Sequence, residues 1–199
     1  PIAPDITPYS WTFDEVAGDT FVTIPASSNK RFPMSNDKGG ILDLRYLSAT
    51  ATSTDFLVLM YDTKYHYDLS NRPIHAMTFL TNGGKDFQFS IPMIIDKMQS
   101  LHFTLYDQSG VNNDVRMALY GSKYYFANAM DAIDNKISPI NKDARLFFYT
   151  TDDAIQLPVA TDEVHATITC NSKNFLLDRI MLYSTGVFRV HISDTSRGR

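Results

Sequence analysis

The sequence is poor in glutamate and in net positive charge, and each shortage excludes a class of protein. Only Glu15 and Glu163 are glutamates among the 22 acidic residues. Because glutamate suits helix surfaces whereas aspartate suits turns and caps, long solvent-facing helices are not expected. The formal net charge is −4 and no basic stripe is present, so nucleic acid is not an expected partner. The longest apolar runs, such as residues 91–95, are too short to cross a membrane.

The chain also has a single cysteine, Cys170, which excludes an intrachain disulfide. It contains no Asn-x-Ser/Thr acceptor for glycosylation. Both features favour assembly in a reducing cytoplasm over a secretory route. Cys170 ends an alternating run that begins at His165, which predicts a strand position for the thiol rather than a reactive site.

Short segments of alternating aromatic or β-branched and polar residues make up much of the chain, and they predict β-strands. Turn residues such as those at 36–40 and 82–85 separate the segments. The predicted strands of the first part are 20–25, 41–48, 55–61, 77–81, 86–95, 101–106 and 115–126; those of the second part are 145–149, 154–158, 165–170, 175–183 and 187–193.

Two segments do not fit the strand pattern. Residues 1–8 hold three prolines, which forbid a helix and predict an extended N-terminal arm. Residues 126–136 are rich in alanine and predict a helix that ends before Pro139. The predicted organisation is therefore an arm (1–8), a first β-domain (9–126), a helical linker (127–143) and a second β-unit (144–199).

The second β-unit repeats part of the first. Three blocks recur in the same order: 20–26 resembles 153–159, 41–46 resembles 175–180, and 56–63 resembles 188–195. The second copy reaches Arg199 before any counterpart of residues 77–126. We therefore predict an all-β fold, a jelly-roll or β-sandwich domain followed by a partial second copy. Half a sandwich exposes an apolar face, so we expect a neighbouring subunit, a strand of another chain or residues beyond Arg199 to cover it.

No motif predicts catalysis, a metal or a cofactor, and we do not expect an enzyme. The five histidines show no metal-ligand spacing, and three of them alternate with apolar residues in predicted strands: His102, His165 and His191. Residues 107–114 are rich in oxygen ligands but lack the pattern of a calcium loop, so a hairpin connection explains them better. G-x-S-x-G is absent, and residues 83–85 lack the remainder of a phosphate-binding loop.

Aromatic residues gather near two strand ends and form a candidate interaction surface. Tyrosine-rich loops offer a large contact area to a protein or sugar at low entropic cost, although sheet packing beneath a capping loop explains them as well. The candidate residues are Tyr61, Tyr65, His66, Tyr67, Tyr124 and Tyr125.

A family resemblance rests on residues 89–95 (FSIPMII), 100–106 (SLHFTLY), 109–110 (SG) and 113–124 (NDVRMALYGSKY). This order of an apolar-proline segment, a strand, a small-residue turn and V-R-x-x-L-x-G-x-K-aromatic resembles virion structural proteins of tailed bacteriophages. The second copy is similar to a companion pattern through residues 184–190 (STGVFRV), 192–194 (ISD) and 197–199 (RGR).

The resemblance implies a jelly-roll or β-sandwich subunit of the capsid or head–tail neck, present in many symmetric copies and without catalytic residues. We therefore expect a non-enzymatic virion protein that forms homo-oligomers and contacts other virion proteins. It would be assembled in the host cytoplasm, with capsid decoration and neck positions both open. The alternative is a β-sandwich module that binds carbohydrate or a host surface, based on the tyrosine-rich loops.

Overall fold

The computed structural model describes residues 5–12, 21–36, 39–80, 86–125, 146–151, 164–169, 177–182, 184 and 186–193. These ranges contain one short helix, α1 (Met77–Leu80), and no helix able to cross a membrane. The strands are β1 (Asp5–Thr12), β2 (Val22–Ile24), β3 (Asn29–Ser35), β4 (Ile41–Ala51), β5 (Phe56–Asp62), β6 (Tyr67–Asp68), β7 (Ile74–His75), β8 (Phe87–Ile95), β9 (Ser100–Asp107) and β10 (Asn113–Tyr125).

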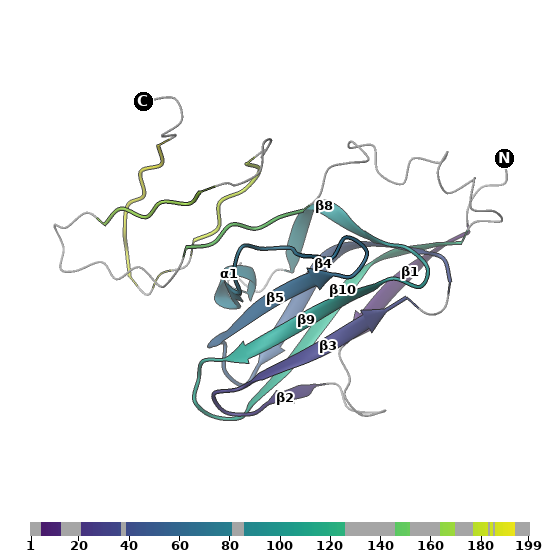
Figure 1. Ribbon diagram of the computed structural model, residues 1–199, viewed down its shortest axis with the longest axis horizontal. Helices are drawn as coiled ribbons and strands as arrows, with labels where there is room; N and C mark the ends of the chain where they lie inside the picture. Colours follow the sequence, from purple (N-terminus) through teal and green to yellow (C-terminus); the bar gives the residue numbers. More distant parts are fainter. Residues whose placement is uncertain are drawn as a thin grey trace.

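Two antiparallel sheets pack face to face (Figure 1). The first sheet has the order β1-β10-β4-β8, and β2 pairs with β10 on the same edge as β1. The second sheet has the order β3-β9-β5-β6, and β7 pairs with β5 on the side of β6. The predicted all-β sandwich is confirmed.

Strict alternation in the central strands builds the core of the sandwich. Phe56, Val58 and Met60 of β5 are at most 2% exposed, while the residues between them are only partly buried. The same pattern holds in β9, where Phe103 is fully buried between outward-facing residues. Because successive side chains of a strand point to opposite faces, each sheet places one apolar set in the core.

The long strand β10 contains an irregularity at Gly121. Its register with β4 shifts between Tyr120 and Gly121. A Cβ atom at Gly121 would lie only 1.9 Å from the carbonyl oxygen of Asp43. Only glycine allows the two backbones to approach this closely.

Two predictions in the first domain need correction. Residues 77–81 were expected to form a strand, but Met77–Leu80 form α1, in which Phe79 N donates to Ala76 O over 2.9 Å. A short apolar run has no periodicity that separates a strand from a helical turn. Conversely, no strand was predicted over β3, a segment that contains Pro33. β3 lies at a sheet edge, which is where a strand tolerates proline.

The predicted N-terminal arm is part of the sandwich over its described residues. It is extended, as expected, but β1 pairs with β10 from Asp5 opposite Tyr125 to Thr12 opposite Ala118. The sandwich therefore includes residues 5–8, and the predicted boundary at residue 9 cuts through an edge strand.

The predicted linker 127–143 and strand 154–158 lie outside the described residues. Residues 146–151 lie against the sandwich, where Asn71 and Thr150 exchange hydrogen bonds of 2.8 and 3.0 Å. Residues 164–169, 177–182 and 186–193 contain no strand, in contrast to the strands predicted there, and the partial second β-domain stays a prediction. Figure 1 shows these segments running outside the two sheets.

Candidate functional site

The turn between β5 and β6 brings together four of the six predicted surface residues. The carboxylate of Asp62 accepts hydrogen bonds from the backbone N–H groups of Lys64 (2.7 Å) and Tyr65 (3.3 Å), which fixes the turn. The next residue, His66, has a backbone conformation in the left-handed region, with a φ of 55°. The residues placed side by side are Tyr61, Tyr65, His66 and Tyr67.

Side-chain contacts hold this turn in place. The Oη atom of Tyr61 lies 3.5 Å from Nδ1 of His66, and the rings of Tyr65 and Tyr67 are 6.2 Å apart. Lys64 Nζ lies 5.1 Å from the centre of the Tyr65 ring.

The same Lys64 ammonium donates to the Asp96 carboxylate over 2.6 Å. Burial alone would lower the pKa of Lys64, but the hydrogen bond and charge of Asp96 outweigh it and raise that pKa. The cation beside the turn therefore stays charged and is already paired.

Tyr124 and Tyr125, the other two predicted residues, lie at the end of β10 in the first sheet. They pair with Ile6 and Asp5 of β1. The ring of Tyr125 contacts the ammonium of Lys123, 5.3 Å from its centre. The structure therefore places the six residues at two separate sites rather than on one surface.

The outer face of the second sheet carries two functional candidates that the sequence did not identify as a pair, Arg31 and His102. A guanidinium nitrogen of Arg31 contacts Nδ1 of His102. The guanidinium also lies over the Tyr61 ring, 5.5 Å from its centre, and the rings of Tyr61 and His102 are 6.0 Å apart. The contact depends on the register of β3 and β9, which local sequence does not reveal.

A chain of hydrogen bonds orients the His102 ring. Because Arg31 can only donate, Nδ1 of His102 is the acceptor. Nε2 therefore carries the proton and donates to Ser100 Oγ over 3.2 Å. Thr63 Oγ1, in turn, donates to the Ser100 carbonyl over 2.6 Å and accepts from Ser100 N over 3.1 Å.

The charge state of His102 follows from its surroundings. Burial lowers its pKa first, and the positive charge of Arg31 lowers it further. A neutral imidazole thus accepts a hydrogen bond from Arg31, which is an exposed residue. This arrangement suits recognition of a carboxylate, because arginine binds such groups in a fixed planar geometry.

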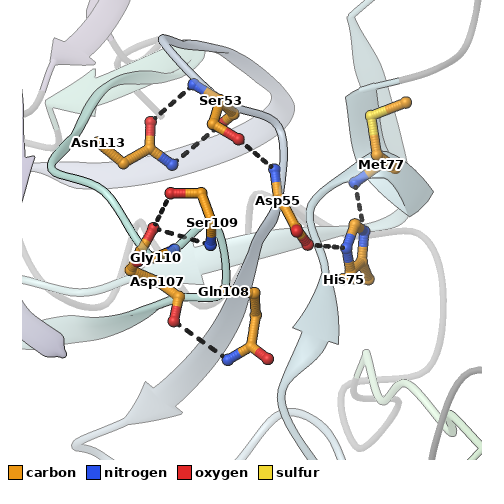
Figure 2. A network of polar contacts seen from close by, with 9 residues as sticks. All are labelled: Ser53, Asp55, His75, Met77, Asp107, Gln108, Ser109, Gly110 and Asn113. Carbon is orange, nitrogen blue, oxygen red and sulfur yellow. Dashed lines mark hydrogen bonds and ion pairs between the residues drawn. The ribbon is translucent and has the colours of Figure 1, made fainter. Parts of the chain in front are cut away.

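The oxygen-rich segment 107–114 is the hairpin connection between β9 and β10 (Figure 2). The buried Asp107 carboxylate accepts from Ser27 N (2.8 Å), Ser109 Oγ (2.6 Å) and Gly110 N (3.0 Å). Burial would raise the pKa of Asp107, but these hydrogen bonds lower it overall. The carboxylate is thus occupied by donors from its own loop and from Ser27, and the described residues contain no cluster of three metal-binding side chains.

Beside this loop, Nε2 of His75 donates a hydrogen bond to Oδ1 of Asp55 over 3.2 Å (Figure 2). Nδ1 of His75 accepts the backbone N–H of Met77 over 3.3 Å, at the first residue of α1. Both ring nitrogens are therefore engaged, and the histidine orients the helical turn.

Comparisons with known proteins do not assign the chain to a family. Neither a protein-family model nor a curated protein sequence matches the chain.

Proposed function

We propose that the chain is a structural subunit of a symmetric protein assembly, and specifically a virion protein of the tailed-bacteriophage kind that contacts capsid or neck proteins. The observation that carries this proposal is a set of exposed apolar side chains in residues 164–193. The most exposed are Val187 (106%), Ile192 (60%) and Leu182 (57%). Within this set, Phe188, Val190 and Ile192 alternate with polar residues, a pattern that suits a strand pairing with a partner.

Leaving these side chains in water opposes stability. Nine large apolar side chains are exposed in the described residues of this region: Val164, Ile168, Leu177, Ile180, Leu182, Val187, Phe188, Val190 and Ile192. Burial of each contributes about 1.5–3 kcal/mol, and a whole domain is stable by only about 5–15 kcal/mol. Contact with other chains is therefore the favourable state for this region.

The strand order of the sandwich supports the same proposal. If β1 and β2 count as one interrupted strand, and β6 and β7 as another, eight strands form two four-stranded sheets. Their orders, β1/β2-β10-β4-β8 and β3-β9-β5-β6/β7, support the proposal that the sandwich is a jelly roll. Viral capsid subunits, lectins and cupins share this architecture, so it supports the virion proposal without excluding the others.

Light scattering on the full-length chain tests the proposal. We expect a mass above the 22.5 kDa of one chain. Replacing Phe188, Val190 and Ile192 together by serine should lower the mass, while Val111→Ser, an exposed apolar residue of the sandwich, should not. A wild-type chain that is monomeric and binds no hydrophobic dye would contradict it. Electron microscopy of labelled particles then distinguishes capsid from neck.

A carbohydrate-binding module is the second candidate, favoured by the tyrosines of the β5–β6 turn, where Tyr65 is 40% exposed. Its rings are partly occupied, because Lys64 lies over Tyr65 and Arg31 lies over Tyr61. Stacking on a sugar needs a free ring face, so the assembly proposal is preferred. A glycan array separates them: reproducible binding that is lost in Tyr65→Ala would favour the carbohydrate module.

A further inference from the structure

The outer face of the second sheet has an apolar centre. In β5 and β9 the inward residues are buried, which leaves Leu57, Leu59 and Tyr61 of β5 and Tyr106 of β9 partly exposed on the outside. The register places Leu57 opposite Tyr106, so these four side chains are contiguous. An apolar centre with aromatic residues is the composition of a protein–protein interface core.

The two edges of this face carry opposite charges. Arg31 of β3 lies opposite Thr104, which itself pairs with Leu59. Asp68 of β6 lies opposite Tyr61 on the other edge. Paired residues of antiparallel strands point to the same side, so Arg31 and Asp68 flank the apolar centre. Within the described part of the chain, neither side chain forms an ion pair.

We propose that this face binds a second copy of the same chain in a two-fold symmetric dimer. In the strand order β3-β9-β5-β6, two strands lie on each side of the line between β9 and β5. Rotation by 180° about an axis along that line exchanges β3 with β6 and β9 with β5. Each Arg31 then faces the edge that carries Asp68 in the partner copy, and the apolar centres meet.

The distances are compatible with this pairing. Arg31 and Asp68 are offset by one row of paired residues on the same face, which is about 7 Å along a strand. An extended arginine side chain, together with the usual angle of about 30° between packed sheets, spans this offset.

Charge explains why the partner is a copy of this chain. Each copy has a net charge of −4, so two copies repel one another unless attractive contacts are built into the interface. A face that carries one cation and one anion on opposite edges provides two such contacts under two-fold symmetry. A basic or an acidic foreign partner would match only one of the edges.

His102 holds the cation in position for this contact. Its neutral Nδ1 accepts from Arg31, and the guanidinium is further held over the Tyr61 ring. Arginine therefore loses less side-chain freedom on forming the new ion pair, which favours association.

Charge reversal in the full-length chain tests the dimer. Arg31→Asp and Asp68→Arg should each weaken self-association in analytical ultracentrifugation by at least about tenfold, because like charges then face one another. The double variant restores opposite charges and should recover association. Arg116→Asp, an exposed residue in the first sheet, is the matched control and should leave the dissociation constant unchanged.

The dimer rests on the proposed function, in which the chain contacts other virion proteins as well as copies of itself. The outcomes can therefore exclude the dimer without excluding that function. Single reversals without effect, or a double variant no better than the singles, would overturn the dimer. If serine substitutions in 186–193 still lowered the mass, the assembly proposal would survive that failure. Circular dichroism of each variant confirms that the exposed substitutions leave the fold intact.

Discussion

Arg31 donates to Nδ1 of His102, so the contact between these two residues requires a neutral imidazole. Protonation of His102 removes the acceptor and places two cations together. The contact is therefore coupled to pH, through a histidine on the face that we assign to self-association.

We expect His102 to titrate below the ordinary value of about 6.5, because burial and the charge of Arg31 both lower its pKa. The unfolded chain then binds the proton more readily, so stability from this site is fully present above about pH 6.5 and decreases as pH falls through the folded pKa. NMR titration of the imidazole measures this midpoint. Arg31→Gln should raise it, and an unchanged midpoint would show that the arginine charge does not act on the ring.

Gly121→Ala should strongly destabilise the sandwich. The added Cβ atom would overlap the Asp43 carbonyl oxygen at 1.9 Å. That oxygen belongs to the backbone of β4, so relieving the overlap requires β4 and β10 to move apart. We expect a loss of about 2–4 kcal/mol in the free energy of unfolding, measured by urea denaturation. Gly186→Ala is the control, because nothing lies within 4 Å of its Cβ position, and it should have no measurable effect.

Replacing phenylalanine by alanine should lower the free energy of unfolding far more in the core than in the exposed region. Phe103 is fully buried between the sheets, so Phe103→Ala should lower the free energy of unfolding by about 3–5 kcal/mol. Phe188 is 39% exposed, and Phe188→Ala should change it by less than about 1 kcal/mol. Equal losses at both positions would mean that residues 186–193 pack into a cooperative core.

Asp107→Ala should loosen the β9–β10 connection. It leaves the N–H groups of Ser27 and Gly110 without their carboxylate acceptor, a loss of about 1–3 kcal/mol. Because the hydrogen bonds lower the pKa of Asp107 overall, its contribution is present above the unfolded value near 3.9 and disappears as pH falls through the folded pKa. Urea denaturation of wild type and variant at pH 7 and pH 3 measures this difference, which should be smaller in acid. Asp114→Ala, which removes the carboxylate that accepts from Thr23 Oγ1, is the milder control.

The sequence predicts the sandwich best where one strand contains its own signal. The alternation of residues 101–106 is enough to locate β9 and to identify Phe103 as a core residue. Prediction from the sequence fails where contacts with other segments determine the structure. Pro33 is acceptable only because β3 is an edge strand. Met77–Leu80 form a helix whose first N–H group donates to His75. Arg31 could not be recognised as a site residue, because its contact with His102 depends on strand register.

Strand β10 also determines when the sandwich can form during synthesis. It pairs with β1, β2 and β4, and its contact between Tyr124 and Ile6 joins residues more than a hundred positions apart. The first sheet therefore cannot close on a nascent chain until Asn113–Tyr125 has been made. At about 5–20 residues per second, the ribosome needs roughly 4–15 s to pass from the end of β4 to the end of β10. During this interval the edge of β4 that faces β10 in the folded sandwich is unpaired, so the nascent chain depends on chaperones or fast closure to avoid aggregation.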